Sequence, residues 1–458
     1  MLLSNPFDRF LAQRPMAVMA RGVLEHLLDP AHLDAVFQAT ARRGYQKELL
    51  FSTLVDLFAD VVLRVEPSVH AAYQRRPDDL NVSATAVYRK LNRVEPAVSA
   101  AVVADSARRA GAVIDELGAA HEPWLPGYRC RVLDGNHLGA TEHRIEELRA
   151  TWAAPLPGRA LVVLDPRWML ATDVFLTPDG HASERSLLDE VLTAVGPRDV
   201  WIADRNFCTL GLVFGIARRL GFFVIRQHGS LDGELIGERK RRGRIHTGVV
   251  FEQKIRLTDP ATGRSRVWRR ITVELKQPTR DGDAELHVLT SLPAAVASAQ
   301  TVCELYRRRW TLETVFQEIT TTLACEHPTL GYPRAALFGF CLALLAYNAV
   351  SVLKAALRAA HGATVVTETV SGYYIALEVR QAADGLSVAV PADEWAGFGT
   401  ATAAGMATWL RTAAARIDLR RYRKHPRGPK KPPPAKAAYQ NGGHVATERL
   451  LRQRRQPR

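Results

Sequence analysis

The sequence contains little cysteine and no closely spaced pair of cysteines. Only Cys130, Cys208, Cys303, Cys325 and Cys341 occur in 458 residues. Their scattered positions predict neither a disulfide framework nor a zinc site, and a reducing cytosol suits them. The first residues also lack a basic leader followed by an apolar run, so we expect no secretion signal.

Long apolar runs are scarce as well. A single segment, Ala335 to Leu353, is nearly all apolar and approaches the length of a membrane span. Tyr347, Asn348 and Ser351 interrupt this segment. We therefore predict a buried helix here, and no membrane partner.

Acidic residues are outnumbered, which gives a net charge of +14 and a pI near 9.8. One segment holds a dense group of cations against the single acid Asp418: Arg416, Arg420, Arg421, Arg423, Lys424, Arg427, Lys430, Lys431 and Lys436. A strongly basic chain favours a polyanionic partner. The many prolines of residues 418–458 predict an extended basic tail, which either tracks DNA phosphates or is a solvated tail.

The remaining composition describes a folded protein of about three domains, because 47% of its residues are apolar. Residues 1–120 have helical periodicity and few strand signals, so we predict an all-α N-terminal domain. Within it, Asn81 or Ser83 could cap a helix that carries a basic group: Tyr88, Arg89, Lys90 and Arg93. This helix is either the recognition helix of a helix-turn-helix or an ordinary basic helix.

Residues 121–228 predict an alternation of strands and helices. The strands are Tyr128–Asn136, Ala160–Leu164, Trp168–Leu176, Val200–Asp204 and Phe222–Arg226, and the helices are Ser183–Val195 and Leu210–Leu220. Three strands, a helix, a strand, a helix and a strand is the element order of a ribonuclease H-like α/β fold. In that fold the first and fourth of these strands lie side by side.

Those two strands end in acids, Asp134 and Asp204. Neighbouring strands would bring the two carboxylates together, where they repel each other unless cations lie between them. Hard oxygen ligands beside a phosphate substrate favour Mg²⁺. Either aspartate taken alone is also explained as a turn former at the end of a strand.

A second β-rich segment lies between Asp204 and the next candidate acid, Glu313, which is 109 residues further on. Alternating runs at 249–257, 267–275 and 284–290 predict strands separated by turns. We therefore predict an inserted β-subdomain at 229–295, the second part of the core at 296–360, and a mostly helical region at 361–417.

The helix predicted at Gln300–Leu323 completes the candidate site. At 100° per residue, one face carries polar side chains, Tyr306, Arg309, Glu313, Gln317 and Thr320, and another face carries apolar ones. A solvated helix face explains a Glu and an Arg four residues apart equally well.

The tyrosine, arginine and glutamate of this helix resemble the Tyr, Arg, Glu, Lys signature of one family of bacterial DDE transposases, the insertion-sequence-four type. Arg129 to Leu353 carries the similarity, in VLDGN with Asp134, WIADRNF with Asp204, FFVIRQ with Arg226 and YRRRWTLETVF with Glu313. Thr320 departs from the family, which usually has lysine at this position.

The resemblance implies roles for these residues. The acids Asp134, Asp204 and Glu313 would be catalytic and would hold two Mg²⁺ ions, for which Mn²⁺ could substitute. Tyr306 and Arg309 would grip DNA phosphates. Trp310 would stack on an extruded base or pack in the core. Further phosphate contacts are implied for three arginines, Arg226, Arg307 and Arg308.

The function implied is a cut-and-paste DNA transposase, and members of the family often release their element through a DNA hairpin. Its partners would be double-stranded DNA at the element ends and at the target, and a second copy of the chain in a synaptic complex. We expect it in the bacterial cytoplasm, at the nucleoid. Two alternatives remain open: a catalytically silent DNA-binding relative, and a ribonuclease H-like nuclease without joining activity.

Overall fold

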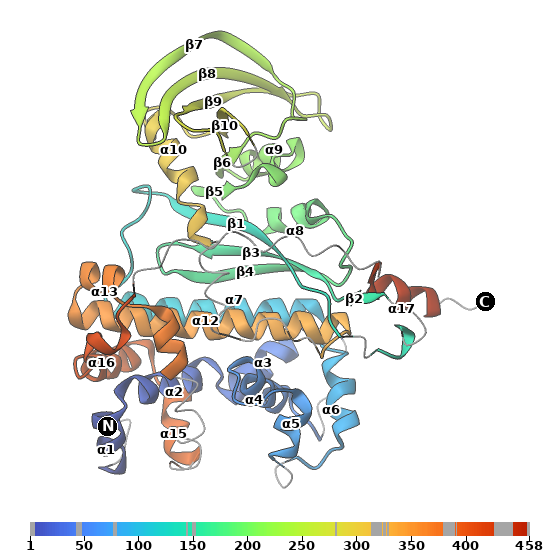
Figure 1. Ribbon diagram of the computed structural model, residues 1–458, viewed down its shortest axis with the longest axis vertical. Coiled ribbons are helices and arrows are strands. Elements are labelled where there is room, and N and C mark those ends of the chain that lie inside the picture. Colours follow the sequence, from blue (N-terminus) through green and yellow to red (C-terminus); the bar gives the residue numbers. More distant parts are fainter. Residues whose placement is uncertain are drawn as a thin grey trace.

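The computed structural model describes residues 5–42, 48–76, 80–142, 145–148, 153–279, 282–312, 323, 327, 329–378, 390, 392–425 and 443–455. One large mixed sheet rises from a layer of helices (Figure 1). The helices nearest to the sheet, α7 (Pro96–Glu116) and α12 (Pro333–His361), run beneath strand β4 (Leu170–Thr177). The sequence-based prediction of a mixed α/β fold is confirmed.

Every element described between residues 5 and 116 is a helix. The other six are α1 Asn5–Gln13, α2 Pro15–Leu27, α3 Pro30–Thr40, α4 Phe51–Val62, α5 Val69–Gln74 and α6 Ala84–Leu91. Proline occupies the first turn of α2, α3 and α7, where its missing N–H costs no hydrogen bond. Side-chain oxygens of Asp29, Ser68 and Ser83 cap α3, α5 and α6.

The basic helix predicted in this region is α6, and part of its charge is used inside the fold. Lys90 Nζ donates to the Leu49 carbonyl and lies 5.9 Å from the centre of the Phe37 ring. Burial lowers the pKa of the Lys90 ammonium. Arg89 and Arg93 are exposed. The recognition role of this helix stays a prediction for these two arginines.

Nine strands form the large sheet in the order β4-β3-β1-β5-β6-β10-β9-β8-β7. Besides β4, they are β1 Arg129–His137, β3 Arg159–Asp165, β5 Asp199–Ala203, β6 Phe222–Arg226, β7 Glu234–Ile245, β8 Gly248–Thr258, β9 Ser265–Leu275 and β10 Glu285–Thr290. Strands β1, β5 and β6 are parallel, and the other neighbours are antiparallel. The predicted order of strands and helices from residue 128 to 226 is confirmed.

The first strands of the sheet are buried on both faces, which explains their continuous apolar runs. Successive side chains of a strand point to opposite faces. Val132 therefore packs with α7 and α12 in one core, and Leu133 packs with α8 (Leu188–Thr193) and α9 (Leu210–Arg218) in the other. Both valine and leucine are fully buried at these positions.

The β-rich segment expected at 229–295 extends this sheet instead of forming a separate one. Strand β10 pairs with β6 through Thr290 and Val224, and β9, β8 and β7 follow outward. Strand β7 was not predicted from the sequence, because its letters ELIGERKRRGRI are mostly charged and do not alternate with apolar residues. As an edge strand it needs few apolar side chains.

The helix predicted at Gln300–Leu323 is observed in its first part and is interrupted by a turn at residues 308–309, while residues 313–322 lie outside the described residues. Helix α10 covers only Ala299–Arg307 and ends at its C-cap, Arg308. The N–H groups of Arg309, Thr311 and Leu312 then bond carbonyls three residues back, which tightens the chain. Tyr306 therefore lies on α10, whereas Arg309 lies in the turn that follows it.

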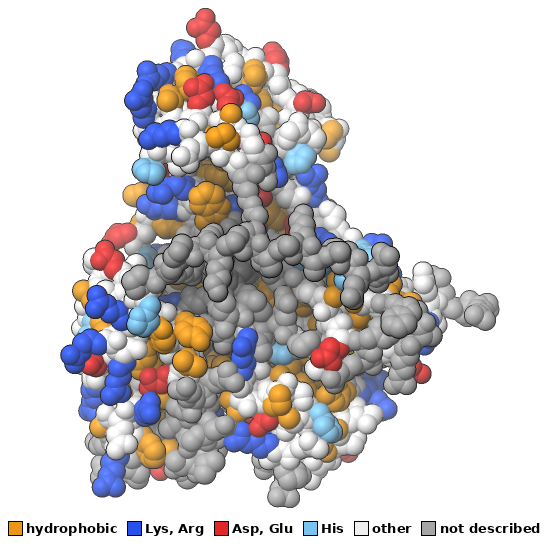
Figure 2. Space-filling view, in the orientation of Figure 1, with side chains coloured by type: hydrophobic (Ala, Val, Ile, Leu, Met, Phe, Trp, Pro, Cys, Tyr) orange, Lys and Arg blue, Asp and Glu red, His pale blue; other side chains and the backbone are white. Residues whose placement is uncertain are grey.

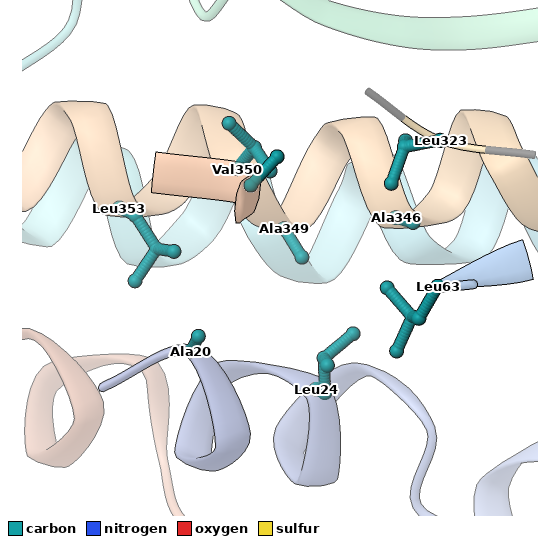
Figure 3. Close-up of a pocket in the computed structure, with 9 residues that line it drawn as sticks. Ala20, Leu24, Leu63, Leu323, Ala346, Ala349, Val350 and Leu353 are labelled. Atoms are coloured by element: carbon teal, nitrogen blue, oxygen red, sulfur yellow. The ribbon is translucent and has the colours of Figure 1, made fainter. Parts of the chain in front are cut away.

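Helix α12 contains the apolar segment Ala335–Leu353 and is a core helix. It is long and apolar enough to cross a membrane, and its most apolar window is 100% buried inside the protein. The prediction of a buried helix is confirmed. Its lower face packs on α2, where Figure 3 shows Ala20 and Leu24 opposite Ala346 and Leu353. The gap between them measures about 10 Å³ and is apolar, which is too small for a ligand.

One polar residue of α12, Asn348, forms hydrogen bonds with the backbone of the edge strand β4. Asn348 is fully buried; its Oδ1 accepts the Ala171 N–H at 2.9 Å, and its Nδ2 donates to the Ala171 carbonyl at 3.0 Å. The same Nδ2 lies 3.1 Å from Ser106 Oγ on α7. One side chain thus joins α12, α7 and the outer edge of β4.

The C-terminal part contains helices α13 Ala363–Thr369, α15 Ala392–Gly399 and α16 Ala403–Ala414. The extended tail predicted at 418–458 is wrong at both described ends. Leu419–Tyr422 forms a 3₁₀ turn with Tyr422 buried. The chain later returns as β11 (His444–Ala446), which pairs with β2 (Ala154–Leu156), and as α17 (Thr447–Arg455). The proline-rich residues 426–442 lie outside the described residues.

A buried histidine makes the stability of this fold depend on pH. His327 is 7% exposed and stacks on Phe58 with ring centres 5.0 Å apart. Burial, helped by the charge of Arg64, lowers its pKa from 6.5 to about 4. The unfolded chain therefore binds more protons between these two values, and stability is lost as the pH falls through this window.

We expect the melting temperature of the wild type to fall more steeply below about pH 6.5 than that of His327→Phe, which keeps the ring stack without the titrating group. Thermal unfolding measured from about pH 7 to about pH 4 tests this. Identical slopes for the two proteins would contradict the assignment.

Candidate active site

Asp134 lies within β1 and Asp204 directly follows β5, at the point where the pairing of these two parallel strands ends. The pairing of β1 with β5 ends at Leu133 and Ala203, and Asp134 and Asp204 are the residues that follow these two in the sequence. Both are partly buried. The adjacency expected from the sequence is therefore observed, and two carboxylates share one edge of the sheet.

The last turn of α10 and the turn after it bring a phenol and a cation, Tyr306 and Arg309, into contact with these acids. Arg309 Nη1 donates to Asp134 Oδ2 at 2.8 Å, and the Tyr306 hydroxyl donates to Asp204 Oδ1 at 3.2 Å. The ion pair is well shielded from water, since the side chains of Arg309 and Asp134 are 8% and 18% exposed. Each acid thus receives one donor from the same short segment.

This geometry corrects the expected solvent face of the helix. The sequence places Tyr306 and Arg309 opposite the apolar side chains, which predicts exposure to water. In the structure α10 packs against the sheet so that the side facing the acids is also buried, and Arg309 is only 7% exposed. The Arg309 guanidinium can be buried here because it forms an ion pair with the carboxylate of Asp134.

Burial also sets the protonation state of Tyr306. Desolvation raises the pKa of its phenol to about 12, and the negative charge of Asp204 adds to the effect, while Arg309 and Arg226 oppose it. The phenol is therefore protonated at neutral pH. It can donate a hydrogen bond, and it cannot act as a base.

The other predicted phosphate contacts are distributed around this centre. Arg226 ends β6, and its Nη2 donates to Asp283 Oδ2 at 2.6 Å, with 17% of the side chain exposed. Arg307 is exposed and pairs with Glu304 at 2.7 Å. Arg308 is exposed and lies 5.6 Å from the centre of the Trp124 ring. Of the three arginines, Arg226 is the one whose charge reaches Tyr306.

Trp310 follows Arg309 and points away from the core. It is 58% exposed, so the alternative that it packs in the core is wrong. An exposed indole leaves base stacking as the open interpretation.

Glu313 and Thr320 lie outside the described residues, so the third predicted acid has no position here. Among the residues that are described, no group of three or more His, Cys, Asp or Glu could hold a metal ion. The two aspartates nevertheless suit a divalent cation. Their donors are hard carboxylate oxygens, and the fold itself already directs the positive charge of Arg309 onto one of them.

Sequence reasoning gave no role to a third acid near these strands, Glu184. Its Oε2 accepts from Asn206 Nδ2 at 2.6 Å. The 3₁₀ turn that carries it, η2 (Glu184–Leu187), has only Ser183 as a capping signal. Nothing in the sequence links residues 184 and 206, because the contact depends on the packing of the sheet.

Comparison with known proteins adds a family match. Residues 125–349 match the family model described as "Transposase DDE domain", which supports a DDE transposase and a polynucleotidyl-transfer enzyme. No curated protein matches the chain. Among solved structures, the chain is similar to piggyBac transposase in a synaptic complex with hairpin DNA, with 8% identity, a TM-score of 0.41 and 83% of each chain covered. At these values the likeness carries no argument about this chain.

Proposed function

We propose that this protein is a cut-and-paste DNA transposase of the insertion-sequence-four type. It would bind the terminal inverted repeats of its own element, cleave each end, and join the freed 3′-hydroxyl to target DNA. The observation that carries the proposal is the adjacency of Asp134 and Asp204 inside the stretch that matches the transposase DDE domain. The strand order β4-β3-β1-β5-β6 supports a ribonuclease H-like core.

In this proposal the residues that hold the divalent cations are Asp134, Asp204 and Glu313. Bound Mg²⁺, or Mn²⁺ in its place, would activate the attacking water or 3′-hydroxyl and stabilise the leaving oxygen. The carboxylates fix where the scissile phosphate must lie. Three further side chains, Tyr306, Arg309 and Trp310, would hold DNA at that point.

Arg309 would have two anionic partners in turn. Without DNA its guanidinium neutralises Asp134, which would otherwise repel Asp204. On DNA binding we propose that it exchanges this carboxylate for a backbone phosphate, which accepts hydrogen bonds from a guanidinium as a carboxylate does. The exchange frees the Oδ2 atom of Asp134 for a cation.

Tyr306 would likewise move its hydrogen bond from Asp204 to a DNA phosphate, as a neutral donor. Its phenol keeps its proton at neutral pH, as an ordinary tyrosine does, and the pKa raised to about 12 extends this to more alkaline pH, so it can donate to a phosphate oxygen without adding charge. Trp310, which is exposed and follows Arg309 in the sequence, would stack on a base extruded from the duplex.

The lobe of β7–β10 offers a DNA-facing surface that supports the proposal. Strand β7 exposes Lys240, Arg241 and Arg244, and among the described residues none of the three forms an ion pair. Figure 2 shows Lys and Arg side chains gathered along one margin of this lobe. Helix α10 connects the lobe to the acids, since Gln300 Nε2 donates to the Arg242 carbonyl at 2.5 Å and Tyr306 lies on the same helix.

Replacing Lys240, Arg241 and Arg244 by alanine should weaken duplex binding and reduce its salt dependence. Each neutralised phosphate contributes about 0.9 to the slope of log affinity against log salt, so the slope should fall by about 2–3. Fluorescence anisotropy with end DNA at several salt concentrations measures it. The matched control removes three other exposed cations of the lobe, Lys254, Arg264 and Arg266. An equal loss of slope in both triple variants would contradict a specific role of β7.

The proposed activity is tested with purified protein and a duplex that carries the element end. We expect Mg²⁺-dependent cleavage at the end, followed by joining of the 3′-hydroxyl to a plasmid. Cleavage without joining would favour a ribonuclease H-like nuclease instead. The joined product should require both chains of a synapsed dimer, so its rate should rise more than linearly with protein concentration.

A catalytically silent DNA-binding relative is the second candidate, and the ion pair between Arg309 and Asp134 favours it, as does threonine at position 320. In that case the protein would bind end DNA specifically and cleave neither strand in Mg²⁺ or Mn²⁺. In both cases we propose that it acts on the bacterial nucleoid in the cytoplasm.

A further inference from the structure

We infer that Glu184 is a positioning residue, whose carboxylate clamps together the two strand ends that carry Asp134 and Asp204. The inference rests on the proposed function, since it concerns the geometry of the same site. It gives a role to Gly135 and Asn206, two residues that stand in the quoted motifs VLDGN and WIADRNF.

The first contact is with the strand end that carries Asp134. Glu184 lies so close to Gly135 that a Cβ atom at position 135 would be 2.3 Å from Glu184 Oε1 and 2.6 Å from its Cδ. A side chain at position 135 would displace the Glu184 carboxylate from this place. Glycine at 135 is therefore required for the carboxylate of Glu184 to reach the backbone of β1.

The second contact is with the turn that carries Asp204. Asn206 Nδ2 donates to Glu184 Oε2 at 2.6 Å, and the next residue of the clamp, Arg185, donates from Nε to the Asn206 carbonyl at 2.8 Å. Asn206 belongs to η3 (Arg205–Phe207), which begins directly after Asp204. Two consecutive residues thus hold both the side chain and the backbone of this turn.

These contacts act where the ladder between β1 and β5 has ended. Its last pair is Leu133 with Ala203, and beyond it β1 stays paired with β3 alone, as far as His137, so no ladder joins the backbone at Asp134 to the turn that carries Asp204. Side chains alternate along a strand. Asp134 faces Arg309 on α10's side of the sheet, and Gly135 faces Glu184 on the other side.

Glu184 therefore acts through the backbone and not as a ligand. Among the described residues it forms no metal-binding group with the two aspartates. Its effect is on the separation of the two carboxylates, which sets how well they share a pair of cations. A misplacement of about 1 Å at such a site can cost about 100-fold in rate.

The experiment reverses the hydrogen bond between residues 184 and 206. Asn206→Asp puts two carboxylates where the 2.6 Å contact now lies, and they repel. The double variant Glu184→Gln with Asn206→Asp restores a donor and an acceptor in the opposite direction, because the glutamine amide then donates to the new aspartate. The control Glu190→Gln makes the same change at an exposed position of α8.

Two quantities are measured on the full chain bound to end DNA: the affinity for Mn²⁺ by calorimetry, and the rate of strand cleavage. We expect Asn206→Asp to weaken Mn²⁺ binding and to lower the rate, each by about 10–100-fold. The double variant should recover most of both, and Glu190→Gln should match the wild type. Melting temperatures of all variants are recorded alongside.

A purely structural role would lower the melting temperature of Asn206→Asp without changing the Mn²⁺ affinity, and that result would overturn the inference. Failure of the double variant to recover Mn²⁺ binding would overturn it too. The proposed function fails separately if the wild type cleaves no DNA while Mn²⁺ binding is weakened in Asn206→Asp and recovered in the double variant.

Discussion

Asp134→Asn should abolish measurable strand cleavage, with a loss of at least about 10³-fold. The substitution removes a charged oxygen ligand, and the stabilisation of a transferring phosphoryl group by bound cations amounts to several kcal/mol, where each 1.36 kcal/mol is tenfold in rate. Asp204→Asn should have an effect of the same size. The loss should appear in the single-turnover rate on end DNA at saturating Mg²⁺.

The fold should survive this change, because asparagine still offers Arg309 an acceptor oxygen in place of Asp134 Oδ2. A matched control is Asp165→Asn, which changes the last residue of β3, on the strand next to β1 and three residues further along than Val162, the partner of Asp134. Its partner is Arg129, at 2.7 Å. The control should keep its cleavage rate even where it loses stability. A cleavage rate of Asp134→Asn within tenfold of the wild type would refute the assignment of the site.

Asn348→Ala should destabilise the protein by about 2–5 kcal/mol. It would leave both the N–H and the carbonyl of Ala171 without their present partner in a fully buried position, and each unsatisfied buried group costs about 1–3 kcal/mol. The contact to Ser106 Oγ is lost as well. Denaturant unfolding of the two proteins measures the difference.

The neighbouring residue Ser351 provides the control for this prediction. Its Oγ donates a single hydrogen bond to the Met169 carbonyl at 2.8 Å, so Ser351→Ala should cost about 1–2 kcal/mol. Equal losses for the two variants would show that the double contact of Asn348 to the edge strand has no special weight. The active-site residues are unchanged in both proteins, which separates stability from catalysis.

The arrangement of β1 and β5 could be predicted because their signals are local. VLD and VWIAD are apolar runs that end in an acid, and the order of elements between them leaves few ways to build a sheet. The pairing of Leu133 with Ala203 then brings Asp134 and Asp204 together. Residue identity and element order were sufficient for this part of the site.

The contacts of Tyr306 and Arg309 could not be predicted in the same way. A helical wheel assumes an unbroken helix and treats a polar face as solvated, whereas α10 ends at Arg307 and its polar side meets the acids. Long-range packing decides both points. A sequence pattern carries the periodicity of one element and not the identity of what packs against it.

Strands β7 and β11 escaped prediction for a related reason. β7 is an edge strand with charged letters, and β11 is three residues long and is defined by its pairing with β2. Neither has the alternation that marks a half-buried strand. The contact of Glu184 with Asn206 likewise joins residues 22 positions apart without any local signal.

The most direct test of the central claim is a structure of the protein with end DNA and Mn²⁺, in which anomalous scattering locates the metal. The account predicts Mn²⁺ bound by the carboxylates of Asp134, Asp204 and Glu313, with the Arg309 guanidinium moved from Asp134 to a DNA phosphate. Manganese bound elsewhere, or a Glu313 carboxylate that does not reach the two aspartates, would contradict it.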